Sequence, residues 1–465
     1  MVFSSVTFLF LFFPTVFLLY YAVPSIKFRN ILLTVASLFF YAWGEKLFVL
    51  LMIFSVLINW LAGLLIIKCP GKDKLITALA VIFNIGMLFA FKYVGFFVEV
   101  LNLVPFISIP NVTVHLPIGI SFFTFQALSY VIDIYRDRSA VQKNFLSMLL
   151  YISFFPQLIA GPIVKYHDIA TQLGKRTVSA EKMASGIRRF IIGLSKKLLL
   201  ADVAAKAVDS IFGMELVEIS GFAAWLGGIL YLVQIYFDFS GYSDMAIGLG
   251  RIFGFEFLEN FNYPYIAVGI RDFWHRWHIS LSTWFQQYLY IPLGGNRKGT
   301  FRTYINLLIV FFATGLWHGA NFTFIAWGMW HGLFMILERA RLIKPEKYPW
   351  LARIYTLFVV LFGFIIFRAD SLSFGLGFIA KMFTPSAFAL GFADAWQHLT
   401  PYMIITIIAA VIGATPIIPF IKSKITAKGE NAAEIISYIL SAALFFLCIL
   451  ILASDTYSPF IYFRF

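Results

Sequence analysis

The chain has 465 residues, of which 61% are hydrophobic, 19% aromatic and only 13% charged. Its mean hydropathy of +0.86 excludes a soluble globular protein and predicts an all-α polytopic membrane protein. The net charge of +13 comes from Lys and Arg in short loops between apolar runs. That pattern is typical of membrane topology, so we expect membrane lipid around the chain and no nucleic acid as a partner.

The apolar runs predict about twelve membrane crossings in one membrane-embedded domain, residues 1–465. A crossing needs about 20 apolar residues. The predicted crossings are 1–22, 30–44, 47–67, 75–98, 117–135, 190–212, 219–245, 303–318, 320–337, 354–368, 399–420 and 435–453. The first run lacks the basic start and small-residue cleavage site of a secretory signal, so we expect it to be retained as a span.

The basic loops predict the orientation of these crossings. Cytoplasmic loops carry the excess of Lys and Arg. The loops expected in the cytoplasm are 27–29, 68–74, 136–143, 165–189, 297–302, 338–353 and 422–428. The turns 99–116, 213–218 and 370–398 are poor in Lys and Arg and are expected to face outward.

Two apolar segments, 144–164 and 284–295, have basic stretches on both sides. Each is expected to enter the membrane and return without crossing, and Pro156, Gly161 and Pro162 are candidate helix breakers in the first. Irregular backbone at membrane depth is tolerated only where protein buries it or it lines a wet cavity. The two segments therefore predict a cavity that opens toward the cytoplasm.

Four of the seven histidines lie between residues 271 and 331. His275 and His278 are three residues apart, so a helix would put them on neighbouring positions of one face. His318 ends an apolar run that starts near Arg302. At about 1.5 Å per residue, it is predicted about 24 Å into the membrane.

Three interpretations of these histidines remain open. A metal site is suggested by the H-x-x-H spacing, but no Cys or carboxylate stands where it would complete a tetrahedral site, so no metal is expected. A structural role, in which the imidazole only satisfies a neighbouring group, is preferred for His275 and His331. A catalytic role needs a neutral imidazole as general base, which burial favours.

Other polar residues have two interpretations each. Asp238 and Asp244 either orient an arginine or histidine or belong to a buried network that fixes helix packing. In GGNRKG (294–299), Arg297 and Lys298 either hold a phosphate-rich donor or form a basic turn that sets topology. Neither G-x-S-x-G nor a P-loop motif is found near the histidines, so direct transfer between donor and acceptor is the simpler chemistry.

The longest motifs are RDFWHRWHISLSTWFQQYLYIPLGGNRKG (271–299) and TGLWHGANFTFIAWGMWHG (314–332). With FFPQLIAGPIVKY, YFDFSGYSDMAIG, FRADSLSFGLGFIAKMF and the terminal SPFIYFRF, they make the chain resemble the membrane-bound O-acyltransferase family over nearly its whole length. It looks most like the alginate O-acetyltransferase branch. The resemblance implies a ring of about 11–12 membrane helices with re-entrant segments around a central tunnel, and a catalytic core at about 117–341.

The resemblance also implies roles for individual residues. The histidine of the W-H-G motif, His318, is the expected catalytic base, and His278 falls on the family's second polar position. Further candidates for contacts with donor or substrate are Arg271, Trp274, Trp277, Trp317, Asn321, Arg297 and Lys298. Packing and interfacial anchoring explain the tryptophans equally well.

The function that the resemblance implies is membrane O-acetyl transfer. Acetyl-CoA is the expected donor substrate, and no bound cofactor is expected. An acceptor polysaccharide such as alginate would receive the acetyl group outside the cytoplasm, through a secreted or membrane-tethered partner that resembles SGNH hydrolases. We expect a multi-pass protein of the bacterial inner membrane. The alternatives are transfer of D-alanine to a cell-wall polymer, a transporter or flippase of an acetylated carrier, and a structural scaffold.

Overall fold

The computed structural model describes residues 1–159, 161–427 and 429–454, so the predicted terminal motif SPFIYFRF lies outside the described residues. The described residues form helices and turns without a β-strand, which confirms the all-α prediction. They form two compact units: residues 1–190 with 243–258, and residues 191–242 with the described residues from 259 onward. The prediction of one membrane domain stays a prediction.

The first unit contains the amino-terminal helices and two π-helical turns. Their bounds are η1 (Phe8–Phe12), α1 (Phe13–Ala22), α2 (Ile26–Glu45), α3 (Phe48–Lys68), α4 (Asp73–Leu88), η2 (Phe89–Tyr93), α5 (Val94–Leu101), α6 (Ile120–Arg136), η3 (Arg138–Ala140), α7 (Phe145–Ser153), α8 (Phe155–Leu158), α9 (Tyr166–Gly174) and α10 (Ala180–Ser195), which continues into the second unit. The long helix α12 (Gly221–Ile252) contributes its last part.

Polar pairs and small residues join the apolar helices of the first unit. Asn59 of α3 and Asn84 of α4 are both fully buried and exchange two amide hydrogen bonds of 3.2 and 2.7 Å. Gly63 leaves room for the ring of Tyr130 of α6, because a Cβ atom there would overlap that ring. Such pairs and close approaches hold helices together where burial of apolar surface cannot, since lipid is as apolar as the helices.

The second unit contains the remaining helices. Their bounds are η4 (Lys196–Ala201), α11 (Asp202–Phe212), the first part of α12, η5 (Pro264–Ile266), α13 (Ile270–Arg276), α14 (Ile279–Phe285), η6 (Gln286–Tyr290), α15 (Thr300–His318), α16 (Phe322–Arg339), η7 (Pro345–Lys347), α17 (Pro349–Arg368), α18 (Leu372–Lys381), α19 (Pro385–Phe388), α20 (Ala393–Trp396), α21 (Pro401–Gly413), α22 (Ile417–Thr426) and α23 (Glu430–Ser454).

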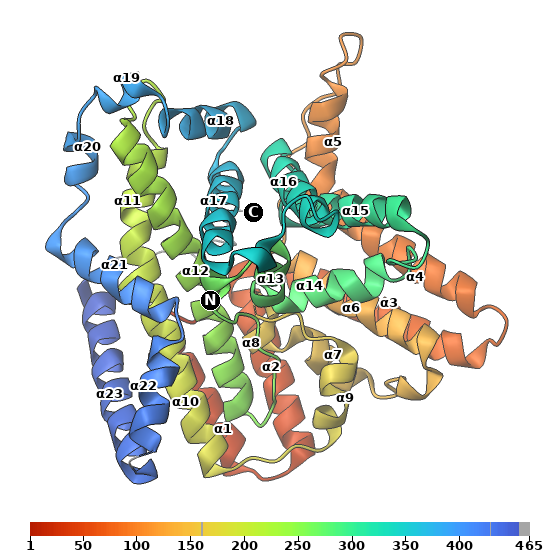
Figure 1. The fold of residues 1–465 in the computed structure, drawn as a ribbon. Helices are drawn as coiled ribbons and strands as arrows, with labels where there is room; N and C mark the ends of the chain where they lie inside the picture. Colours follow the sequence, from red (N-terminus) through yellow and green to blue (C-terminus); the bar gives the residue numbers. More distant parts are fainter. Residues whose placement is uncertain (160, 428, 455–465) are drawn as a thin grey trace. The chain divides into compact units, whose positions relative to one another are not determined.

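Within this unit, α15 and α16 form a helical hairpin and lie side by side (Figure 1). A Cβ atom at Gly315 would overlap the backbone of Phe324, and one at Gly328 would overlap the backbone of Phe311. The two backbones therefore touch, as in small-x-x-x-small helix packing in membranes. This contact fixes the position of the W-H-G motif at the end of α15.

Six helices of the described residues are long and apolar enough to cross a membrane. They are 48–68, 73–101, 221–252, 300–318, 349–368 and 430–454. The predicted crossing 399–420 is instead a pair of helices, α21 and α22, bent by 66°. The bend lies where Pro416 cannot continue the hydrogen bonding of α21, and the crossing at 399–420 stays a prediction. The remaining predicted spans lie on shorter, broken or more polar helices, and the chain is a multi-pass membrane protein.

The segments predicted to be re-entrant form short helices. α7 has 9 residues and α8 has 4, and the chain breaks between them at Phe154. α14 and η6 together cover 12 residues, about 18 Å at 1.5 Å per residue, which is shorter than a hydrocarbon core of about 30 Å. These lengths suit segments that enter and return, and their membrane placement stays a prediction.

Candidate active site

The H-x-x-H motif spans a break between two helices. α13 ends at Arg276, Trp277 is extended, and His278 has left-handed backbone angles (φ 45°, ψ 53°) before α14 begins. His275 is therefore exposed and His278 is fully buried. The expectation that both occupy one helical face was wrong, because the helix does not continue through the motif.

A polar network surrounds His278 on one side. Its Nδ1 lies 3.2 Å from Oδ1 of Asn260, which also accepts hydrogen bonds from the backbone N–H of Ser280 at 3.2 Å and from its hydroxyl at 2.9 Å. The backbone carbonyl of Asn260 accepts from the N–H of Ile279 at 2.9 Å. The segment at Asn260 thus holds the helix break in place.

Aromatic rings cover the other side of His278. The ring of Phe239 lies edge-on at 4.6 Å and that of Trp317 at 6.0 Å. Nε2 of His278 has no hydrogen-bond partner among the residues that the structure describes. The break between α13 and α14 lies outside the candidate spans, and burial there lowers the pKa of His278 to about 3. The imidazole is therefore neutral at physiological pH.

His318 is the last residue of α15 and is 5% exposed. Its ring contacts Trp317 at 5.0 Å, Trp327 at 4.9 Å and Phe367 at 5.2 Å, each edge to face. One aromatic ring each from α15, α16 and α17 thus packs against the imidazole at the end of α15. A general base at neutral pH must be a neutral imidazole, which is the role expected of His318.

Trp317 links the two candidate catalytic histidines. Its ring contacts His278 from the α13–α14 break and His318 from the end of α15. Residues forty apart in the sequence therefore meet around one indole. The structure brings His278 and His318 into one site, although their catalytic roles stay predictions.

His331 lies within α16 and is fully buried. Its ring stacks on Phe273 at 6.1 Å and meets Trp274 and Trp327 at 5.3 Å each. A Cβ atom at Gly363 of α17 would lie 2.9 Å from its Nε2. These contacts agree with a packing role for His331.

The predicted tryptophans are all buried in aromatic clusters. Trp274 packs against Phe311 and Trp327, and Trp277 stacks on Phe273 at 5.6 Å. Trp317 contacts both candidate histidines. For Trp274 and Trp277 the packing interpretation accounts for the contacts in the structure.

The residues predicted to make polar contacts to donor or substrate lie on α13, on the turn before α15 and at the start of α16. Arg271, Arg297 and Lys298 are exposed, on α13 and on the turn before α15. Asn321 caps α16: its Oδ1 accepts from the backbone N–H of Thr323 at 3.0 Å. The role of these four residues in donor binding stays a prediction.

The two aspartates of α12 pair with cations. In the second unit, Nζ of Lys197 lies 2.9 Å from Oδ1 of Asp238 and 2.7 Å from Oδ1 of Asp202. In the first unit, the guanidinium of Arg189 lies 2.6 Å from Oδ1 of Asp244. The Asp238 pair favours the buried-network interpretation, whereas Asp244 pairs with an arginine, as the other interpretation expects. Lys197 was missed because it stands in an apolar run with no recognisable motif.

Asn260 and Ser280 were also missed by sequence reasoning. Neither stands at a motif spacing that points to His278, and only the fold brings Asn260 beside a residue eighteen positions later. No group of three His, Cys, Asp or Glu side chains in the described part of the chain is placed to hold a metal ion.

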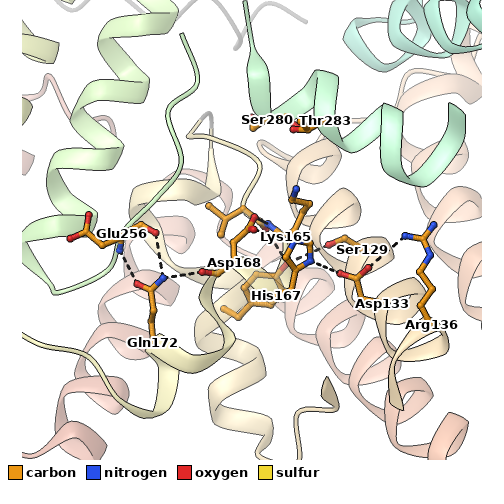
Figure 2. Close-up of polar contacts among 12 residues, drawn as sticks. Ser129, Asp133, Arg136, Lys165, His167, Asp168, Gln172, Glu256, Ser280 and Thr283 are labelled. Atoms are coloured by element: carbon orange, nitrogen blue, oxygen red, sulfur yellow. Dashed lines mark hydrogen bonds and ion pairs between the residues drawn. The ribbon is translucent and has the colours of Figure 1, made fainter. Parts of the chain in front are cut away.

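The first unit contains a separate polar cluster around His167, shown in Figure 2. Its Nδ1 lies 3.0 Å from Asp133 and its Nε2 lies 3.2 Å from Asp168. Hydrogen bonds to Asp133 and Asp168 raise the pKa of His167 to about 9. It is a cation at neutral pH and cannot act there as a general base.

Comparisons with known proteins agree with the motifs. The model of the membrane-bound O-acyltransferase family matches residues 87–379. The chain is 40% identical over 491 residues to a Pseudomonas putida protein named probable alginate O-acetylase AlgI, with 100% of both chains covered. It is 34% identical to the peptidoglycan O-acetyltransferase of Helicobacter pylori over 82% of this chain and 80% of that one. It is 30% identical to the teichoic acid D-alanyltransferase of Bacillus subtilis over 54% of this chain and 68% of that one.

Proposed function

This chain belongs to the membrane-bound O-acyltransferase family and is an acyltransferase, and from that premise we propose that it passes acetyl groups from acetyl-CoA to an extracytoplasmic polysaccharide such as alginate. The full-length similarity to alginate O-acetylases supports the acetyl group and the polysaccharide. The bacterial inner membrane is the proposed location, because a cytoplasmic donor and an external acceptor meet only there.

The observation that carries the proposal is the pairing of His278 and His318 around Trp317 in a buried aromatic site. In the proposed reaction, His318 takes the proton of the acceptor hydroxyl while the hydroxyl oxygen attacks the carbonyl carbon of the thioester. The new C–O bond forms, the C–S bond breaks, and the thiolate leaves and takes up a proton. Holding both reactants in one dry site supplies much of the rate, because a chance encounter becomes a positioned reaction.

His318 also stands where its charge is tolerated during the reaction. The carboxyl end of a helix carries a partial negative charge, and His318 is the last residue of α15. The imidazolium that forms when His318 takes a proton is stabilised by that end, whereas the resting neutral ring suits the surrounding aromatic rings. Both properties are those of a general base.

We also propose that a secreted or membrane-tethered subunit resembling SGNH hydrolases receives the acetyl group and delivers it to the polysaccharide. The proposed acceptor polymer lies outside the cytoplasm, whereas the proposed donor, acetyl-CoA, is cytoplasmic. A membrane enzyme with an external partner connects the two compartments. Transfer of D-alanine is the alternative, favoured by the similarity of about half of the chain to a D-alanyltransferase.

Reconstitution of the purified chain in lipid vesicles tests the function. Acetyl-CoA labelled in the acetyl group is supplied on one side and an acceptor oligosaccharide, with or without the partner, on the other. We expect labelled ester on the acceptor or partner and an equal amount of free CoA thiol. Movement of the label across the membrane with its thioester intact would indicate a transporter. No reaction with any acyl thioester would contradict the proposal.

A further inference from the structure

The hydrogen bonds around Asn260 determine which nitrogen of His278 carries the proton. The backbone N–H of Ser280 can only donate, so the Asn260 atom that faces it must be the carbonyl oxygen. That same oxygen lies 3.2 Å from Nδ1 of His278 and can only accept. Nδ1 is therefore protonated, and in the neutral ring Nε2 carries the lone pair.

The lone pair of Nε2 is buried without a hydrogen-bond partner among the described residues. A buried acceptor without a partner is unfavourable, and natural structures contain few of them. The left-handed backbone of His278 is a second unfavourable feature, since only a small share of residues other than glycine adopt it. Such features persist where the surroundings enforce them, and they cluster at functional sites.

We propose that Asn260 is a positioning residue that keeps the proton of His278 on Nδ1, so that Nε2 accepts a hydrogen bond from a hydroxyl of the acceptor. This inference rests on the proposed function, and it states which of the two reactants, donor or acceptor, His278 binds. Polarising the thioester carbonyl would need an N–H at Nε2, which this tautomer does not have. His278 therefore binds the acceptor, and His318 remains the base.

Nitrogen NMR of the full chain in lipid nanodiscs, with ¹⁵N-labelled histidine, tests the tautomer directly. The His278 signals are assigned as those missing from the His278→Gln variant. We expect a neutral ring with Nδ1 protonated and Nε2 unprotonated. A neutral ring with the proton on Nε2 would overturn the inference, and this measurement does not depend on any acetyl transfer.

The Asn260→Asp variant tests the positioning role in the reaction. The aspartate keeps an acceptor oxygen for Nδ1 and for Ser280, but its charge stabilises the imidazolium of His278. The acid limb of the pH–rate profile should therefore move upward by about one pH unit or more, and the KM for the acceptor should rise more than the KM for acetyl-CoA. A profile that superimposes on that of the unmodified protein would contradict the inference.

Asn144→Asp is the matched control, because Asn144 caps α7 with its side-chain oxygen and aspartate caps helices equally well. It should leave the profile unchanged. If Asn260→Asp does not fold, His278→Gln gives the second kinetic measurement, and a rise in KM for acetyl-CoA alone would overturn the inference. Failure of the proposed function has a different signature, which is the absence of transfer from any acyl thioester by the unmodified chain.

Discussion

The five-residue pattern Gly-x-Trp-His-Gly occurs twice in the hairpin of α15 and α16, at 315–319 and at 328–332. The first glycine of each copy has the same packing role, because Gly315 and Gly328 both allow the backbones of α15 and α16 to come into contact. The histidines differ. His318 is the last residue of its helix, whereas His331 lies inside a helix that continues to Arg339.

The difference shows that a local pattern sets packing while the position in the helix sets the chemistry open to the side chain. At a helix end, His318 has a favourable site for the charge it gains on taking a proton. His331 has no such end, and the rings of Phe273, Trp274 and Trp327 surround it. The comparison therefore predicts that the first copy catalyses and the second packs.

Removal of the His318 imidazole should have the largest effect on activity. General base catalysis contributes about 10²–10⁴-fold in rate, so His318→Ala should lower acetyl transfer by at least about 100-fold. The variant should still fold and insert, as judged by size-exclusion chromatography in detergent. Transfer of labelled acetyl at the unmodified rate would end the assignment of His318 as the base.

Removal of the His278 imidazole should have the next largest effect. His278→Ala should lose about 10- to 100-fold in transfer rate, because the base remains but a positioned group is lost. The measurement is the same labelled transfer assay with both histidine variants at equal amounts of folded protein. A rate equal to that of the unmodified chain would make His278 a structural residue.

The second copy of the pattern should respond differently. His331→Phe keeps the stacked ring and removes two ring nitrogens that have no hydrogen-bond partner among the described residues, so stability should stay within about 1 kcal/mol of the original. Activity should remain within about threefold. His318→Phe is the matched substitution in the first copy and should abolish transfer. An equal loss of acetyl transfer in both variants would mean that position in the helix does not decide which of the two histidines is catalytic.

The sequence could predict which helix carries each histidine but not which side chains meet. Apolar runs predicted α15 and α16, and family motifs pointed to His318 and His278. The H-x-x-H spacing predicted both histidines on one helical face, but the helix ends before Trp277. The residue types Trp277 and His278 do not by themselves predict the left-handed backbone found at His278. Asn260 was not predictable, because its role depends on a contact that only the folded chain creates.

The smallest effect is expected at His167, which differs from the histidines of the hairpin because it carries a charge. Its pKa in the folded chain is about 9, above the ordinary value of 6.5, so its contribution to stability is full below pH 6.5 and is lost as the pH rises through 9. The side chain is 48% exposed, so solvent screening limits this contribution to about 1 kcal/mol or less. His167→Gln should therefore lower the unfolding temperature at pH 6 and leave it unchanged at pH 10.

His398 provides the control of opposite sign. Burial lowers the pKa of His398, so the unfolded chain binds its proton more readily and this residue destabilises the fold as the pH falls. His398→Gln should not lower the unfolding temperature at pH 6. Thermal unfolding followed by tryptophan fluorescence between pH 6 and pH 10 compares the two variants. Equal shifts in both would mean that the carboxylates of Asp133 and Asp168 do not hold His167 as a cation.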